Sequence, residues 1–311
     1  MSRLKQLDTL AALLAGELPP RVDWMSVLAL ANHTLVTPQL YSAALCSGTA
    51  DRMPAEVLGF LHEVWTRNRE RNERLFAQLR EAVAALNSAG IEPMLLKGAA
   101  YWATLGRPAE HDRILTDLDL LVRPDEAEAA VGALEAAGFV TLKRHDDPEA
   151  HVAAELGRPG DVGMIDLHRR PPGPEDLGRA ALAVADGVVS VGWDGVRATA
   201  PSPTLQVFLL VLHDQFHDGG YWRGEFVLRH LLEIAALSRR PGWVDWSLIA
   251  ELAPTRLVRN ATDAQLLAAA QICSALAPGR AHRPWVRVQH ARRCAQFAWP
   301  RLNPFLRMLA A

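Results

Sequence analysis

The stretch that decides the fold is residues 94–139, MLLKGAAYWATLGRPAEHDRILTDLDLLVRPDEAEAAVGALEAAGF. At its centre, residues 117–122 (DLDLLV) form a short apolar run that contains two acidic residues. Alternate side chains of a β-strand point to opposite faces, so Asp117 and Asp119 share one face and the leucines beside them share the other. The run therefore predicts a strand that is buried on its leucine face and carries a pair of carboxylates.

Short apolar runs separated by turn residues extend on both sides of this strand, from about residue 91 to residue 170. They predict four or five strands, with one helix over residues 125–138 (DEAEAAVGALEAAG). The Gly- and Pro-containing connection at residues 157–163 (GRPGDVG) predicts a hairpin, which makes the sheet at least partly antiparallel or mixed. A shorter β-like piece follows at residues 187–200 (GVVSVGWDGVRATA).

Helical patterns flank this segment. Leu and Ala recur at three- and four-residue spacing in the first part of the chain, and Gly90 is suited to end the last long helix there. Helical spacing returns from Pro203 onward. We therefore expect an α+β protein with a helical region at 1–90, an α/β core at 91–200 and a second helical region at 201–311.

Composition narrows the classes of protein. The 311 residues include 33 Lys and Arg against 35 Asp and Glu, for a formal net charge of -2, which argues against a nucleic-acid-coating or membrane-adsorbing surface. The longest later apolar run, residues 205–212, is too short to cross a bilayer, and the N-terminus lacks the apolar core of a secretory signal. Three widely spaced cysteines form no CxxC pair, which favours a reducing, cytoplasmic location: Cys46, Cys273 and Cys294.

The Asp117/Asp119 pair predicts a bound cation. Two carboxylates on a largely buried strand repel each other, and each is costly to bury without a positive partner. Mg²⁺ suits such a pair because it prefers hard oxygen ligands and often binds carboxylates together with substrate phosphates. A bare Asp-x-Asp at the solvated end of a strand is the alternative, and the neighbouring motifs argue against it.

Two neighbouring motifs support a phosphate and metal site. Upstream, Lys97 and Gly98 end a strand and open a helix near Ala99, where backbone amides and a lysine can approach an anion. The spacing is not that of a P-loop. Downstream, residues 164–168 (MIDLH) predict another apolar strand, whose Asp166 could complete the metal site.

In this order the motifs resemble the nucleotidyltransferase fold of the DNA polymerase β superfamily. The chain looks most like the bacterial group called "nucleotidyltransferase family protein", in which Leu-Lys-Gly replaces the usual Gly-Ser and Arg-x-x-x-Asp-x-Asp-Leu-Leu-Val is followed by Ile-Asp-Leu-His. The resemblance covers about residues 60–255, including a helical part with an acidic residue near Glu233. The motif positions are occupied here by Arg113, Asp117, Asp119, Asp166 and His168.

The resemblance implies two-metal phosphoryl transfer with two Mg²⁺ ions and an NTP as co-substrate. Asp117 and Asp119 would hold the ions that neutralise the phosphates, and Asp166 would hold the ion that activates the acceptor hydroxyl. The triphosphate and nucleotide would be bound by Lys97, Gly98, Arg113 and His168. The products would be a nucleotidylated acceptor and pyrophosphate.

The acceptor has no motif of its own in the sequence. A peptide or protein hydroxyl, a small molecule and a nucleic-acid end all stay open, although the near-neutral charge makes a long nucleic acid the least favoured. Two other functions also stay open: a kinase-like phosphotransferase that uses the same metal and triphosphate site, and a non-catalytic module that binds a nucleotide or a peptide. Base preference and oligomeric state are not encoded in any motif that we can interpret.

Some residues allow two interpretations. His213 and His217 are four residues apart on one helical face and could bind a metal, or serve at a helix end or in an acceptor pocket; no second set of histidines is evident. Arg113 could contact phosphate or pair with a nearby aspartate, and His168 could instead bond to backbone at a strand end. Tyr101 and Trp102 could line a base pocket or belong to the core, and residues 285–311 could dock a partner or pack on the helical region.

Overall fold

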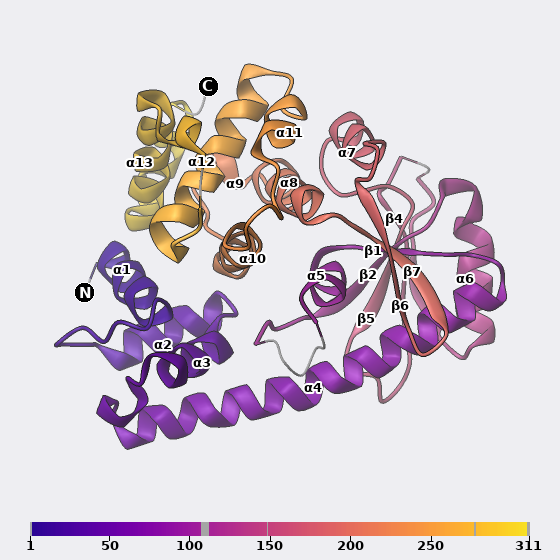
Figure 1. Ribbon diagram of the computed structural model, residues 1–311, viewed down its shortest axis with the longest axis horizontal. Helices are drawn as coiled ribbons and strands as arrows, with labels where there is room; N and C mark the ends of the chain where they lie inside the picture. The colour runs from indigo at the N-terminus through magenta and orange to yellow at the C-terminus, as the bar shows by residue number, and fades with distance from the viewer. Residues whose placement is uncertain (1, 107–111, 148, 277, 310–311) are drawn as a thin grey trace. The chain divides into compact units, whose positions relative to one another are not determined.

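The chain is described by a computed structural model that covers residues 2–106, 112–147, 149–276 and 278–309 (Figure 1). It falls into two compact units. The first, which we call the helical unit, comprises Met1–Asn68, Asp112–Ile114 and Leu210–Ala311; the second, the α/β unit, comprises Arg69–His111 and Leu115–Leu209. Each unit is assembled from separate stretches of chain, and the sequence-based boundaries at residues 90 and 200 stay a prediction.

The α/β unit is built on a mixed seven-stranded sheet with the strand order β3-β4-β5-β2-β1-β7-β6. Five of the strands lie between residues 91 and 170, as the sequence predicts, and β4 and β5 form the expected antiparallel hairpin. The strands are β1 (Met94–Leu95), β2 (Asp117–Leu121), β3 (Val140–Arg144), β4 (Val152–Gly157), β5 (Met164–His168), β6 (Val188–Trp193) and β7 (Val196–Pro201).

Residues 187–200, expected only as a short β-like piece, form the β6–β7 hairpin and one edge of this sheet. Its turn contains Asp194 and Gly195, whose φ values of 46° and 88° match the two left-handed central residues of a type I′ turn. β7 then pairs in parallel with β1. The hairpin therefore covers the edge of β1 that β2 leaves open.

Helices pack on the sheet through apolar side chains. α5 (Lys97–Leu105) contacts β2 and β7, α6 (Ala127–Ala136) contacts β3 and β5, and α7 (Glu175–Leu182) follows β5 (Figure 1). The second half of α4 (Ala55–Ser88) contributes Leu75 and Leu79 to the same core. α4 ends two residues before Gly90, whose φ of 78° confirms the predicted glycine stop.

Polar side chains of α4 also hold the chain leading into β2 and β5. The Arg71 guanidinium donates to the carbonyl oxygens of Leu115 (2.6 Å) and Val162 (2.5 Å), and the Gln78 amide donates to that of Gly163 (2.8 Å). These carbonyls lie just before the two strands. α4 thereby fixes the starts of β2 and β5, the strands that carry the predicted aspartates.

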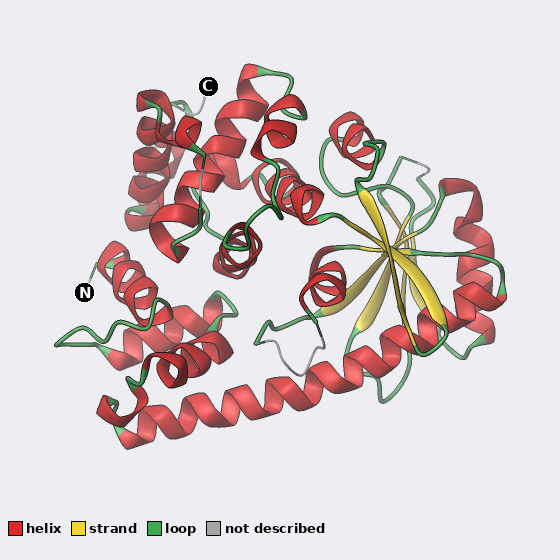
Figure 2. Ribbon diagram, viewed as in Figure 1, coloured by secondary structure: helices red, strands yellow, loops and turns green. Residues whose placement is uncertain are grey.

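The helical unit contains no strand among its described residues (Figure 2). In it α12 contacts both α10 and α13, and each of these helices carries a fully buried apolar side chain: Leu231, Leu267 and Val286. α8 begins at Pro203, as the sequence predicts. The helices are α1 (Arg3–Leu14), α2 (Trp24–His33), α3 (Thr37–Ser47), the first part of α4, the end of α8 (Pro203–Leu212), α9 (Gly220–Arg223), α10 (Leu228–Ser238), α11 (Trp246–Glu251), α12 (Arg256–Cys273), α13 (Pro284–Ala298) and α14 (Asn303–Arg307).

The elements confirm an α+β fold with helices before and after the strand-bearing segment. In the described part of the chain, no helix is both long enough and apolar enough to cross a membrane.

We expect Leu118→Ala in β2 to lower the free energy of unfolding by about 2 to 5 kcal/mol, because truncating a buried leucine removes apolar contacts and leaves a cavity. Leu118 is 0% exposed on the face of β2 opposite the aspartates. The matched control is Leu142→Ala in β3, where the same truncation occurs at a side chain that is 58% exposed. Chemical denaturation measures both; equal losses for the two variants would contradict the assignment of Leu118 to the core.

Candidate active site

The centre of the candidate site is the carboxylate of Asp119, which is 2% exposed. Its Oδ1 atom lies 2.6 Å from Lys97 Nζ and 2.9 Å from His168 Nε2. Three residues that the sequence analysis singled out separately therefore meet at one oxygen atom. They come from β2, from the start of α5 and from the end of β5.

The backbone brings Lys97 to this position. β1 ends at Leu95, and the Leu96 amide donates to the Asp119 carbonyl (3.0 Å), which extends the antiparallel pairing by one residue. Lys97 then adopts a φ of 44° and begins α5. A left-handed conformation at a non-glycine residue is strained, and such strain is typical of sites where the surrounding structure fixes a side chain for function.

The start of α5 also provides anion-binding potential. α5 begins at Lys97, two residues earlier than the sequence predicts, so Gly98 lies in its first turn and is buried. The first amides of a helix lack partners within the helix and carry the positive end of its dipole. Lys97 and Gly98 thus lie at a helix N-terminus, where backbone amides commonly bind anions in proteins.

The pairing of β2 with β5 brings the third aspartate alongside. The two strands are parallel, with Asp119 aligned with Asp166 and Asp117 aligned with Met164. Residues aligned across neighbouring strands share a face, so all three carboxylates lie on one face of the sheet. Ligand atoms of Asp119, Asp166 and His168 lie within 4.8 Å of one another.

The ionisation of these groups follows from burial and charge. Burial alone would raise the pKa of Asp119, but the Lys97 ammonium and the His168 hydrogen bond hold that pKa well below its usual range. Burial likewise opposes the charge of Lys97, yet the Asp119 carboxylate raises the pKa of the lysine. Asp119 and Lys97 therefore form a charged pair inside the protein.

Asp166 behaves differently. Burial, followed by the negative charges of Asp119 and Asp117, raises its pKa from 3.8 to about 6. One lysine thus leaves the three carboxylates short of positive charge. A divalent cation bound by carboxylate oxygens would relieve that repulsion, so the donor set present fits the predicted metal site.

A family model described as "Uncharacterised nucleotidyltransferase" matches residues 20–273 of the chain. The chain belongs to this family. It is accordingly an enzyme of the nucleotidyltransferase class, as the Lys-Gly turn and the three aspartates predict.

A solved structure similar to this nucleotidyltransferase is the solution structure of the antibiotic-resistance factor ANT(2'')-Ia. The match has a TM-score of 0.40 and 14% sequence identity, and it covers 58% of this chain and 90% of that chain. A comparison with curated proteins finds no matching relative.

The remaining predicted residues of the nucleotidyltransferase have other surroundings. Arg113 belongs to the helical unit, where its buried guanidinium Nε donates to Glu233 Oε1 at 2.5 Å. The salt bridge considered for Arg113 therefore exists, but its partner is a glutamate rather than a nearby aspartate. His168 bonds to the Asp119 side chain, so the alternative of a backbone-bonded histidine is wrong. Trp102 is 1% exposed and belongs to the hydrophobic core.

Sequence reasoning missed two features. The ion pair between Lys97 and Asp119 joins residues in different motifs, and only the pairing of β1 with β2 shows that they meet. It also missed His230, which lies on α10 and bonds to Asp214, the residue after His213. The sequence signal that could have identified it is a histidine between leucines, in residues 228–232 (LRHLL).

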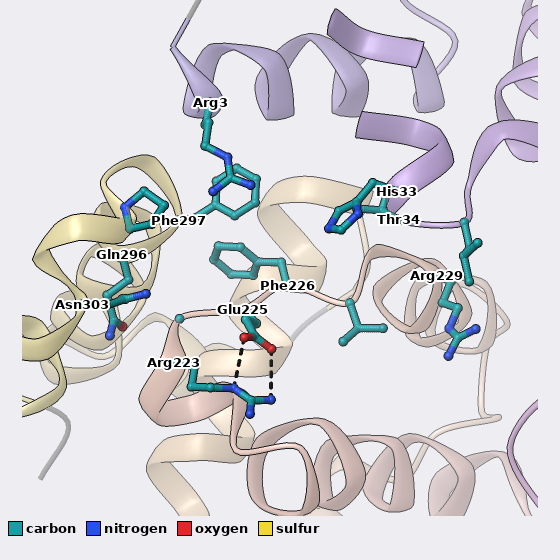
Figure 3. Close-up of a pocket in the computed structure, with 14 residues that line it drawn as sticks. Arg3, His33, Thr34, Arg223, Glu225, Phe226, Arg229, Gln296, Phe297 and Asn303 are labelled. Carbon is teal, nitrogen blue, oxygen red and sulfur yellow. Dashed lines mark hydrogen bonds and ion pairs between the residues drawn. The ribbon is translucent and has the colours of Figure 1, made fainter. Parts of the chain in front are cut away.

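The helical unit of the nucleotidyltransferase also contains a cavity of about 450 Å³ (Figure 3). Phe226 and Phe297 form an aromatic wall with ring centroids 5.9 Å apart, and the Arg3 guanidinium lies 5.3 Å from the centroid of Phe297. Arg223 and Glu225 form a two-pronged ion pair at another side. The volume of the cavity is within the range of small-molecule binding sites.

We expect Asp166→Asn to stabilise the metal-free enzyme at pH 8 and to do so less at pH 5. The raised pKa means that the folded state holds the Asp166 proton more tightly than the unfolded state does. This contribution to stability is complete below the unfolded pKa near 3.8 and is lost as the pH rises through about 6. Asparagine removes the charge and therefore the loss.

Thermal unfolding in EDTA at both pH values measures the effect. The control is Asp176→Asn, which neutralises a side chain on α7 that is 93% exposed and should shift the melting temperature similarly at both pH values. A variant Asp166→Asn that is less stable than the native protein at pH 8 would contradict the proposed repulsion.

Proposed function

We propose that this protein is a Mg²⁺-dependent nucleotidyltransferase that transfers an NMP group from an NTP to a hydroxyl of a peptide, a protein or a small molecule. The observation that carries the proposal is the register of β2 against β5. It sets Asp119 beside Asp166 with Asp117 on the same face, and Lys97 at the start of α5 contacts that same cluster. The family of the chain supports the same reaction class.

Asp117, Asp119 and Asp166 would hold two Mg²⁺ ions. When bound, the ions would neutralise the triphosphate and favour ionisation of the acceptor hydroxyl. The pKa of Asp166, raised by burial and then by the charges of Asp119 and Asp117, supports this assignment. Asp117 is only partly buried, so a ligand can reach its carboxylate from solvent. The Thr116 hydroxyl donates to its Oδ1 atom at 3.1 Å.

The other side chains have separate roles. Asp166 would also accept the proton of the acceptor hydroxyl, whose ionisation the ion held by Asp166 would favour. Lys97 adds positive charge beside the phosphates, and the first amides of α5 at Gly98 bind phosphate oxygens. His168 bonds to Asp119 and would hold it in position, while the predicted contact of His168 with the nucleotide stays a prediction. The predicted contact between Arg113 and the nucleotide stays a prediction.

In the transfer step, the acceptor oxygen forms a bond to the α-phosphorus while the bond from that phosphorus to the bridging oxygen of the β-phosphate breaks. The acceptor proton passes to Asp166 Oδ, and the bond electrons leave with pyrophosphate. The same residues could serve attack on the γ-phosphorus, as in a kinase, or binding without turnover. The nucleotidyltransferase family favours the α-phosphorus.

Composition supports the remaining parts of the proposal. A net charge of -2 is poorly suited to a long nucleic-acid acceptor. Cys46, Cys273 and Cys294 are free thiols, which is in keeping with the predicted cytoplasmic location.

Calorimetry with each NTP tests the nucleotide site. We expect Mg²⁺-dependent binding to the native protein and a loss of at least roughly tenfold in affinity for Asp117→Asn/Asp119→Asn, because the variant removes two of the three metal-binding carboxylates. Asp125→Asn, at an exposed aspartate outside the cluster, is the control and should bind as the native protein does. Binding that is equally tight without Mg²⁺ or in the double variant would refute the metal site.

Transfer itself is tested with NTP labelled at the α- or γ-phosphate. We expect the acceptor to gain the α-label, and we expect Asp119→Asn and Asp166→Asn each to lower the rate by about a hundredfold or more. Asp119→Asn strips the buried Lys97 of its ion-pair partner, so its fold must be checked by thermal unfolding. Asp166→Asn is the sharper variant, because it should be inactive while at least as stable as the native protein.

Transfer of the γ-label would replace the proposal with a phosphotransferase. An unchanged rate in Asp166→Asn would remove Asp166 from the reaction.

A further inference from the structure

A second group of potential metal ligands lies in the helical unit, where α8 ends. Residues His213–His217 form a π-helical turn rather than a continuation of the α-helix. π-helical turns are rare and occur frequently at functional sites. Gly220 allows the chain to pass close to this turn, since a Cβ atom there would lie 2.6 Å from the Asp214 carbonyl oxygen.

His213, His217 and Asp218 can each direct one ligand atom to a common point. These three ligand atoms lie within 4.8 Å of one another. The rings of His213 and His217 have centroids 5.3 Å apart, and His213 Nδ1 is 3.3 Å from Asp218 Oδ2. His217 is exposed and Asp218 is 37% exposed at its side chain, so an ion can reach them from solvent.

A buried carboxylate supports this group from behind. Asp214 Oδ1 lies 3.4 Å from His213 Nδ1 and accepts a hydrogen bond from His230 Nδ1 at 2.7 Å, while Oδ2 accepts one from the Gln265 amide at 2.9 Å. Gln265 in turn accepts from Arg293, which offsets the buried negative charge. Asp214 and its hydrogen-bond partners therefore fix the turn that carries His213 and His217.

The donor set identifies the class of metal. Two imidazole nitrogens and one carboxylate oxygen favour a divalent transition-metal ion such as Zn²⁺, whereas Mg²⁺ prefers oxygen ligands such as the carboxylates of Asp117, Asp119 and Asp166. We propose that His213, His217 and Asp218 bind such an ion. Three protein ligands leave coordination positions for an oxygen or sulfur atom of a bound molecule.

This inference does not depend on the proposed nucleotidyl transfer, because the two sites use different residues and different donor chemistry. It places a metal in the helical unit, where Arg113 is the residue with a predicted role at the nucleotide.

Zn²⁺ titration of the full-length, tag-free protein by calorimetry tests the site, with Co²⁺ absorbance as a spectroscopic probe of imidazole coordination. The native protein should bind one Zn²⁺ with micromolar or tighter affinity, and Asp117→Asn/Asp119→Asn should bind it equally well. His217→Ala and Asp218→Asn should each weaken binding by at least about tenfold, since each removes one of three ligands. Both substitutions change residues near the surface, and thermal unfolding checks their fold.

The matched control is His33→Ala, which removes another exposed histidine of the same unit and should leave Zn²⁺ binding unchanged. The proposal is overturned by the absence of Zn²⁺ binding, by binding that His217→Ala leaves intact, or by binding that disappears in Asp117→Asn/Asp119→Asn. In the last case the ion would belong to the aspartate cluster.

Discussion

The buried ion pair of Asp119 with Lys97 is the interaction on which the α/β unit depends. A carboxylate that is 2% exposed is costly unless it is paired and hydrogen-bonded, and here one oxygen atom receives both the lysine ammonium and the His168 ring. The pair ties the start of α5 to β2, and the histidine ties β5 to the same strand. The strain at Lys97, with a φ of 44°, is tolerated because this contact and the pairing of β1 with β2 fix the residue.

The same pair leaves the three carboxylates with more negative charge than the one lysine neutralises, and a functional site can use this excess. One ammonium stabilises Asp119, whereas burial and then the charges of two other carboxylates raise the pKa of Asp166 to about 6. A lysine that already contacts Asp119 also competes with any cation for that carboxylate. Binding of a metal and its phosphate ligands would therefore exchange one electrostatic partner of Asp119 for another, which couples the position of Lys97 to substrate binding.

The helical unit handles its buried charges in another way. Arg113 pairs with Glu233, and the Asp214 carboxylate is surrounded by two histidines and a glutamine that links it to Arg293. Glu233 and Gln265 come from parts of the sequence distant from Arg113 and Asp214. Such networks specify one arrangement of helices, because a displaced helix would leave a buried charge unpaired.

The sequence by itself determined the α+β class, the strand that begins at Asp117, the glycine stop at Gly90 and the shared face of Asp117 and Asp119, because period-two and helical spacing and turn residues are local properties. It could not determine that Lys97 and His168 both contact Asp119, that Arg113 pairs with a glutamate 120 residues away, or that His230 completes the Asp214 network. Those contacts depend on strand order, register and helix packing. Only the tertiary structure decides them, since each joins groups that no spacing along the chain relates.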